Sequence, residues 1–267
     1  MKSKNYKAFI VEGQAREPQI IENLQRIHFN HSNFKIITLP AGLNIYMLWK
    51  RLANDDFETD IIEILREDSE ELEKTLVGLS RDDFSEVFLF FDYDAHQDNL
   101  PETVSGNDVL IKMLANFDNE TENGKLYISY PMVEALRDFQ CGLCGNYKDC
   151  YCDVDAFANY KQISSKYAEY PDFRKYTFEI WREVLNVFAM RISCFYNKDG
   201  IIRYDDYKEN VSPIELYKLQ KKYILQKKIF IISAFPEFLL DYFTVRFWNA
   251  CIKCSRCQAV GCSKVSS

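Results

Sequence analysis

The chain has 267 residues, of which 47% are hydrophobic and 27% are charged, so we expect one large globular domain or one domain with an appendage. Its 40 acidic and 33 basic residues give a net charge of -7, which argues against a protein that holds nucleic acid by general electrostatic attraction. No apolar run is long enough for a signal peptide or approaches the roughly 20 residues that a membrane helix needs. We therefore expect a cytoplasmic protein with no membrane contact, whose nine cysteines are thiols or metal ligands before they are disulfides.

The first 140 residues alternate between short apolar runs and helical patterns. The apolar runs are rich in β-branched and aromatic residues and predict buried strands. They cover residues 6–11, 34–39, 87–91 and 125–129. The helical patterns cover residues 18–27, 43–52, 60–65, 69–79, 107–116 and 132–139. Near-continuous apolar strands that alternate with helices predict an α/β fold with a parallel sheet covered on both faces.

Beyond residue 140 the pattern becomes mainly helical and aromatic. Long helices are expected over residues 172–190 and 213–226, and another follows through "FPEFLLDYFTVRFW". Between them the apolar stretch 229–233 predicts a strand that can return to the first sheet. We therefore divide the chain into an α/β part, residues 1–140, and a mainly helical part with a cysteine-rich loop and tail, residues 141–267.

Three carboxylates stand where predicted strands end. Glu12 follows the first strand in "FIVEGQAREP", and Asp92 and Asp94 follow the third in "FLFFDYD". Ligands of such sheets bind beyond the carboxyl ends of the strands, and alternation along an extended segment points Asp92 and Asp94 to the same side. Each carboxylate alone is also typical of a helix cap. Together they predict a site for magnesium or manganese, which prefer oxygen ligands.

This arrangement resembles the TOPRIM domain of topoisomerases, primases and OLD-type nucleases. In that family a glutamate followed by glycine ends the first strand, and Asp-x-Asp ends the third. Glu12-Gly13 and Asp92-Tyr93-Asp94 match these motifs, and the resemblance covers roughly residues 5–140. It implies a Rossmann-like TOPRIM fold in which Glu12 is a base or metal ligand and Asp92 and Asp94 hold magnesium.

The longer stretches "VEGQAREP", "FFDYD" and "YISYPMVEAL" look like the stand-alone TOPRIM proteins of bacterial anti-phage defence, such as the nuclease component of PARIS-type systems. The resemblance implies a magnesium-dependent nuclease that cleaves RNA or DNA in abortive infection. The resemblance also implies control by a separate ABC-type ATPase, which is consistent with the absence of a P-loop motif from this chain, and it allows a homodimer as the active form.

Two other classes of protein use similar acidic motifs. A non-catalytic subunit can use the same acidic edge to sense a metal-bound nucleotide or to dock onto a partner. A phosphatase of the haloacid dehalogenase type needs Asp-x-Asp after its first strand, and it is disfavoured because that strand ends in Glu12 here.

Four residues near the motifs are candidate supports for the site. Glu17 fits the start of the first helix, and Arg16 beside it either pairs with Glu17 or holds a phosphate. Glu134 follows the fourth strand, where it either supports the site or is a solvated helix residue. His96 follows Asp94 by two residues and either serves a phosphate or a proton, or is a loop residue without a role. The other two histidines, His28 and His31, are expected at the surface.

Two cysteine clusters and one lysine-rich stretch have open interpretations. The loop "CGLCGNYKDCYC" suits either a tetrahedral zinc site or free thiols, and it contains Cys141, Cys144, Cys150 and Cys152. In the tail "CIKCSRCQAVGC" zinc is favoured over an iron–sulfur cluster, and its thiols belong to Cys251, Cys254, Cys257 and Cys262. The lysines of "KLQKKYILQKK" either steer a nucleic-acid backbone or form the solvated face of a helix.

Overall fold

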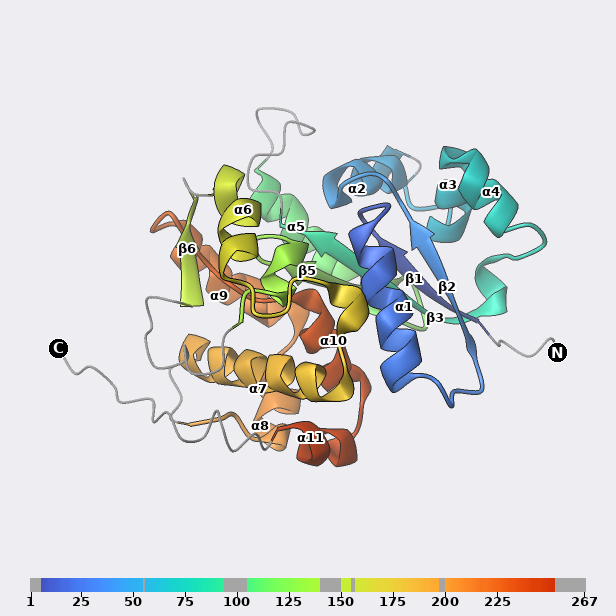
Figure 1. The fold of residues 1–267 in the computed structure, drawn as a ribbon. Helices are drawn as coiled ribbons and strands as arrows, with labels where there is room; N and C mark the ends of the chain where they lie inside the picture. The colour runs from blue at the N-terminus through green and yellow to red at the C-terminus, as the bar shows by residue number, and fades with distance from the viewer. Residues whose placement is uncertain are drawn as a thin grey trace. The chain divides into compact units, whose positions relative to one another are not determined.

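The structure is a computed structural model that describes residues 6–54, 56–93, 105–139, 150–154, 157–196 and 200–252 (Figure 1). The chain divides into two compact units, Met1–Tyr127 and Ile128–Ser267. The division falls inside the fourth predicted strand, and the domain boundary near residue 140 stays a prediction.

A five-stranded sheet organises the first unit. Its strands are β1 (Tyr6–Val11), β2 (Lys35–Pro40), β3 (Phe84–Asp92), β4 (Asp118–Asn119) and β5 (Gly124–Ser129), whose last two residues belong to the second unit. Their order across the sheet is β2-β1-β3-β5-β4. β1 runs parallel to β2 and to β3, and only the short β4 is antiparallel to β5 among the pairings described. The predicted α/β class with a mostly parallel sheet is confirmed.

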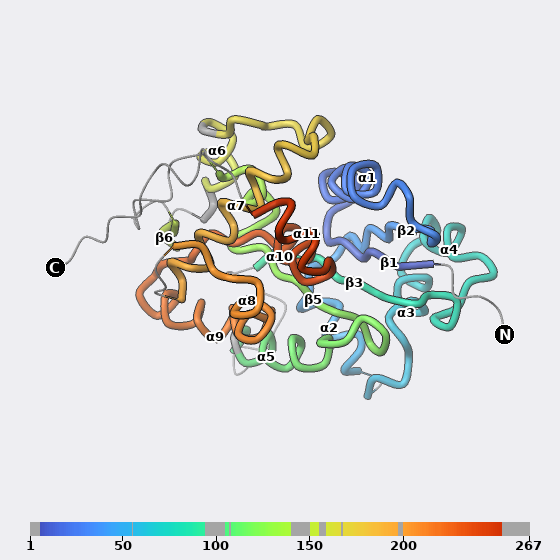
Figure 2. The backbone as a smooth tube through the Cα atoms, turned by 90° about the horizontal axis from the view of Figure 1, so that it is seen from below, coloured from blue at the N-terminus to red at the C-terminus, as the bar shows by residue number. Residues whose placement is uncertain are grey.

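Helices lie on both sides of these strands. They are α1 (Arg16–His28), α2 (Ile45–Asn54), α3 (Ile61–Asp68), α4 (Glu70–Thr75) and α5 (Gly106–Asn116), with a 3-10 turn η1 (Arg81–Asp83) before β3. Figure 2 shows α1 on one side of the strands and α2 and α5 on the other, and α2 contacts both α3 and α5. The apolar pattern of residues 18–27 predicts a shared face of Ile20, Ile21, Leu24 and Ile27; α1 buries the first three, and Ile27 is half-buried.

The central strands are buried along most of their length, as a sheet covered on both faces requires. Phe9 of β1 packs against Phe88 and Phe90 of β3, with ring centroids 5.3 and 5.7 Å apart. Burying each such side chain contributes about 1.5–3 kcal/mol. The one charged side chain buried in β1, Lys7, forms an ion pair with Glu86 of β3. The apolar side chains of β1 and β3 therefore fix both strands, and with them the positions of the residues at their carboxyl ends.

The second unit is mainly helical, as predicted for the C-terminal part. Its elements are η2 (Val133–Leu136), β6 (Tyr151–Asp153), α6 (Phe157–Tyr167), η5 (Phe173–Lys175), α7 (Phe178–Phe195), α8 (Tyr204–Asn210), α9 (Pro213–Ile224), β7 (Lys228–Phe230), α10 (Ala234–Tyr242) and α11 (Val245–Cys251). The long α7 contacts both α10 and α11. Side-chain caps fix where α7 and α9 begin: Thr177 accepts from the Ile180 N–H, and Ser212 accepts from the Glu215 N–H.

Three elements of this unit differ from the sequence predictions. The helix expected over residues 132–139 is the single 3-10 turn η2. The strand expected over residues 229–233 does not join the five-stranded sheet; β7 pairs antiparallel with β6, and Ile232 makes one isolated bridge to Tyr130. The helix expected through residues 235–248 is divided into α10 and α11, because the Thr244 carbonyl accepts from the Phe247 and Trp248 N–H groups and starts a new helix.

Candidate functional site

Glu12 and Asp92 lie side by side at the carboxyl ends of β1 and β3. The Glu12 N–H donates to the Phe90 carbonyl at 3.2 Å, which continues the pairing of the two strands by one residue. The Asp92 N–H then donates to Glu12 Oε2 at 3.1 Å. Both residues are half-buried. The expectation that strand ends bring these two acidic residues together therefore agrees with the geometry.

The turn after Glu12 is held by a second carboxylate. Glu17 lies in the first turn of α1 and is only 7% exposed, and its Oε1 accepts from the Gly13 N–H at 3.1 Å. A β-carbon at residue 13 would lie 2.5 Å from Glu17 Oε2 and 2.7 Å from Oε1. Any larger residue would displace the Glu17 carboxylate from the Gly13 N–H, so this contact favours glycine. The contact was not predicted. The signal was the four-residue spacing between Gly13 and Glu17.

The loop after β2 supports Glu12 from its backbone side. The Ala41 N–H donates to the Val11 carbonyl at 2.8 Å, and the Gly42 N–H donates to the Glu12 carbonyl at 3.0 Å. Gly42 has a φ of 67°, a conformation that favours glycine. The main chain of Glu12 is thus bonded to β3 on one side and to the loop after β2 on the other, and its side chain extends from a fixed backbone.

Other predicted residues of this site have mixed outcomes. Asp94 and His96 lie outside the described residues. Arg16 is the first residue of α1 and is half-buried, and the two alternatives for its role stay predictions. Within the described ranges no group of three or more His, Cys, Asp or Glu side chains is placed to hold a metal ion.

The side chains of Glu12 and Asp92 nevertheless have the chemistry that a hard cation requires. Glu12 and Asp92 offer carboxylate oxygens from adjacent strand ends. Magnesium commonly takes one or two carboxylates and keeps several waters, so it does not require a third protein ligand. The donor set is therefore compatible with magnesium or manganese and unlike the nitrogen and sulfur ligands that zinc prefers.

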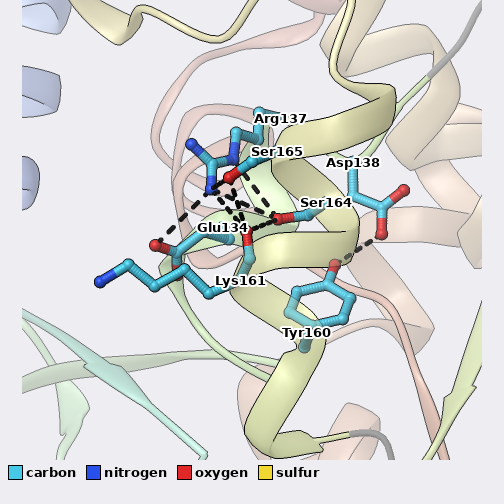
Figure 3. Close-up of polar contacts among 7 residues, drawn as sticks. All are labelled: Glu134, Arg137, Asp138, Tyr160, Lys161, Ser164 and Ser165. Carbon is cyan, nitrogen blue, oxygen red and sulfur yellow. Dashed lines mark hydrogen bonds and ion pairs between the residues drawn. The ribbon is translucent and has the colours of Figure 1, made fainter.

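Glu134 belongs to the second unit and is held there by a buried arginine (Figure 3). It is 2% exposed, and its Oε1 lies 3.9 Å from Arg137 Nη2. Arg137 also donates from Nε and Nη2 to the Ser164 hydroxyl at 3.4 Å, from Nη2 to the Lys161 carbonyl at 3.1 Å, and to the Ser165 hydroxyl. The alternative that Glu134 is a solvated helix residue is wrong. Its support of the acidic site stays a prediction.

The residue after Arg137 starts a second set of polar contacts. Asp138 accepts a 2.7 Å hydrogen bond from the Tyr160 hydroxyl and lies 3.8 Å from Arg191 (Figure 3 shows the first of these contacts). Burial, reinforced by the Asp138 carboxylate, raises the pKa of Tyr160 well above its ordinary value, so the hydroxyl stays a donor. These contacts join the segment after η2 to α6 and α7. They were not predicted, because the charged pair in "VEALRDF" looks like an ordinary helix surface.

The cysteines that the structure describes are reduced. Cys150 is buried and Cys152 is half-buried, and neither forms a disulfide. Burial, with the carboxylates of Asp138 and Asp153 as lesser causes, raises the pKa of Cys152 to about 12. Zinc binds the thiolate, so a bound ion would have to supply the charge that favours deprotonation. Cys141 and Cys144 lie outside the described residues, and the zinc site stays a prediction.

The tail and the histidines are described only in part. Cys251 is buried, and burial raises its pKa to about 11; the other tail cysteines lie outside the described residues. His31 is exposed as predicted. His28 is not a surface residue: it is half-buried at the end of α1, and burial lowers its pKa to about 4.

Comparisons of the chain with protein families, with curated proteins and with solved structures found no match. In the part of the chain that the structure describes, no helix is both long and apolar enough to span a membrane.

Proposed function

We propose that the chain is a magnesium-dependent nuclease of the TOPRIM type that cleaves RNA or DNA as an effector of anti-phage defence. The observation that carries the proposal is the 3.1 Å hydrogen bond from the Asp92 N–H to Glu12 Oε2, which joins two acidic residues at adjacent parallel strand ends. The matching of Glu12-Gly13 and Asp92-x-Asp94 to the TOPRIM motifs points in the same direction.

The proposed chemistry assigns a different role to each carboxylate. Magnesium bound at this edge would lower the pKa of a coordinated water and neutralise charge on the phosphate. Asp92 would hold the ion, together with Asp94. Glu12 accepts the proton of the attacking water, and its bond to the Asp92 amide fixes its orientation. Glu17 positions Glu12 indirectly, because its bond to the Gly13 N–H fixes the turn that follows Glu12.

The test compares cleavage by wild type and by Glu12→Gln. The purified full chain is incubated with plasmid DNA and with total RNA, in magnesium and in EDTA. The glutamine keeps an oxygen that accepts from the Asp92 N–H but has no charge and no useful basicity. We expect magnesium-dependent cleavage by wild type and a loss of about 100-fold or more in Glu12→Gln, as for removal of a general base.

Glu22→Gln is the matched control, because Glu22 is an exposed carboxylate on α1. It should cleave like wild type, and circular dichroism should show that both variants are folded. Full cleavage by a folded Glu12→Gln variant would refute the mechanism.

A second function is favoured by one observation. Glu12 and Glu17 both accept hydrogen bonds from backbone N–H groups, and side chains that bond locally to the backbone often serve structure alone. On this alternative the acidic edge binds a metal-bound nucleotide or a partner without cleaving. Magnesium binding by a chain that cleaves neither RNA nor DNA would support this second function.

The proposal includes control by a separate ATPase, because the sequence has no P-loop of its own. Expressing the chain alone and beside a neighbouring ATPase gene, and challenging both cultures with phage, tests this control. Equal nuclease activity in the two cultures would remove the ATPase from the proposal and leave the acidic site unaffected.

A further inference from the structure

Residues 221–228, "KKYILQKK", join α9 to β7 and carry four lysines without an acidic residue. We name this segment the basic turn. From residue 216 to residue 236 the sequence contains no Asp or Glu, although the whole chain has a net charge of -7. The nearest acidic side chain in the strand register is Asp153, opposite Lys228. The basic turn is therefore a local positive surface on an acidic protein.

Three lysines of the basic turn have no acidic partner among the residues that the structure describes. Lys222 and Lys227 are exposed. Across the described residues, no ion pair is formed by Lys221, Lys222 or Lys227. Lys218, one turn earlier on α9, is different because it pairs with Glu215 at 2.6 Å. The positive charge is thus available to an anion from outside the chain.

Lys227 occupies a backbone position that favours glycine. Its φ is 58°, in the left-handed region where side chains other than glycine are uncommon. Two hydrogen bonds impose this conformation: the Lys227 N–H donates to the Ile224 carbonyl at 2.9 Å, and the Lys227 carbonyl accepts from the Val154 N–H at 2.9 Å. A lysine at this position is costlier for folding than glycine would be, which suggests that its side chain has a use.

Two further side chains complete the surface. The Lys228 ammonium lies over the ring of Tyr151 on the paired strand β6, 4.4 Å from the ring centroid. Leu225, at the tip of the turn, is 86% exposed. Surfaces that bind single-stranded nucleic acid combine lysines for the phosphates with apolar and aromatic groups for the bases.

We infer that the basic turn binds the phosphate backbone of a nucleic acid, with Lys222 and Lys227 as its main contacts. The choice of nucleic acid as the ligand rests on the proposed function. The positive charge and the geometry of the turn are independent of that function. A continuous polyanion engages several lysines at once and releases counterions, which gives a local surface useful affinity on an otherwise repulsive protein. An exposed leucine between two lysine pairs suits a base next to its phosphates better than it suits a carboxylate-rich protein surface.

Lysines near the end of a helix also complement its dipole. That role explains Lys221 and Lys222 at the end of α9, but it does not explain Lys227, which lies beyond the helix in a strained conformation. The two roles are separable by measuring binding and stability on the same variants.

The first experiment measures binding in EDTA, where magnesium-dependent cleavage cannot occur. Fluorescence anisotropy follows the full chain on labelled single-stranded RNA, single-stranded DNA and duplex DNA of about 20 nucleotides, from about 50 to about 200 mM salt. For Lys222→Gln/Lys227→Gln we expect about 10-fold weaker binding at the lowest salt. The slope of log affinity against log salt should fall by about 1.4–1.8, as for two lost phosphate contacts.

The matched control is Lys74→Gln/Lys175→Gln, which removes the same charge. Lys74 lies among the glutamates of α4, and Lys175 lies 4.0 Å from Asp172. The control should bind within about 2-fold of wild type. An equal loss in both double variants, or no binding by wild type at low salt, would overturn the inference. Binding of a polyglutamate peptide in place of every oligonucleotide would also overturn it and indicate an acidic protein partner.

The second experiment uses Lys227→Gly, which relieves the left-handed strain and removes one cation. We expect a higher melting temperature together with weaker oligonucleotide binding, an opposition that a purely structural lysine would not produce. A higher melting temperature with unchanged binding would remove Lys227 from the surface. Because both readouts are independent of cleavage, an inactive wild-type chain would contradict the proposed nuclease without contradicting this site.

Discussion

The contact between Gly13 and Glu17 predicts a cost for Gly13→Ala that depends on the presence of the Glu17 carboxylate. Gly13 does not have a positive φ, so alanine fits the backbone and only the contact opposes it. The added carbon would lie 2.5 Å from Glu17 Oε2, so the carboxylate must move away and give up its bond to the Gly13 N–H. Losing a hydrogen bond to a charged group costs about 1.5–3 kcal/mol. Alanine returns about 0.4–1 kcal/mol by restricting the unfolded chain. The net expectation is a loss of about 1–2.5 kcal/mol of stability.

A double-mutant cycle measures this dependence. Urea unfolding is recorded for wild type, Gly13→Ala, Glu17→Ala and the double variant, by fluorescence and by circular dichroism, since two units can unfold separately. In the Glu17→Ala background the alanine at residue 13 should be neutral or slightly stabilising, which gives a coupling energy of about 1.5–3 kcal/mol.

Gly78→Ala is the control, because Gly78 has a φ of 73° and nothing within 4 Å of its missing β-carbon. It should cost about 1 kcal/mol from strain alone and combine additively with Glu17→Ala. Additivity of Gly13→Ala and Glu17→Ala within about 0.5 kcal/mol would refute the contact as the reason for glycine.

Three further predictions concern groups away from the acidic edge. Burial lowers the pKa of His28 to about 4 in the folded chain, so between pH 6.5 and 4 the unfolded chain binds a proton that the folded chain does not. The free energy of unfolding should therefore fall by about 2–3 kcal/mol as the pH drops through that window. His28→Gln should make the free energy of unfolding, measured by urea unfolding, less dependent on pH. Arg137→Ala leaves the Glu134 carboxylate buried without its cation, so the free energy of unfolding should fall by about 3–5 kcal/mol. A fall of less than about 1 kcal/mol would show that the pair does not stabilise the fold. If the cysteine loop is a zinc site, metal analysis of protein purified without chelator should find zinc that is lost in Cys152→Ser, whereas a stable metal-free protein would identify the cysteines as free thiols.

The sequence predicted the local elements of the first unit well, because their signals are local. The apolar run of residues 6–11 has the same bounds as β1. The third strand is longer than predicted and begins at Phe84, because buried and half-buried residues precede its apolar run. The two residues of β4 carry no periodicity at all, so only their pairing with β5 identifies them as a strand.

The pairing of β7 shows where local patterns fail. Its residues are apolar enough for a central strand, and an apolar strand can satisfy its backbone groups against either sheet. The choice of β6 as partner depends on contacts across some 80 residues of sequence, Tyr151 with Phe230 for example. The local sequence of residues 229–233 does not indicate which strand will be its partner.

The sequence predicted which acidic residues lie at the strand ends, but not which side chains hold them in place. Placing Glu12 near Asp92 required only that β1 and β3 be parallel neighbours. Finding that Glu17 bonds to Gly13, or that Glu134 is buried beside Arg137, requires knowing where side chains point and what covers them. The sequence alone does not distinguish a buried carboxylate from a solvated one.

The acidic edge either bonds only to the backbone or also binds a metal, and stability in two buffers separates these roles. In EDTA, Glu12→Gln exchanges a charged acceptor for a neutral one at the Asp92 N–H, which costs about 1 kcal/mol. If the edge binds no metal, magnesium changes the stability of neither wild type nor variant.

A metal site predicts a different response to magnesium. At a concentration 100 times its dissociation constant, magnesium should stabilise wild type by about 2.7 kcal/mol, because it binds the folded chain and not the unfolded one. Asp92→Asn should lose most of that gain, because it removes a ligand, and Glu12→Gln should lose part of it, because it removes a negative charge near the ion. Glu22→Gln should keep the full gain. Thermal melts of the four proteins, with and without magnesium, measure the difference directly. A wild-type melting temperature that magnesium leaves unchanged would show that the hydrogen bond between Glu12 and Asp92 holds two strand ends together and holds no ion.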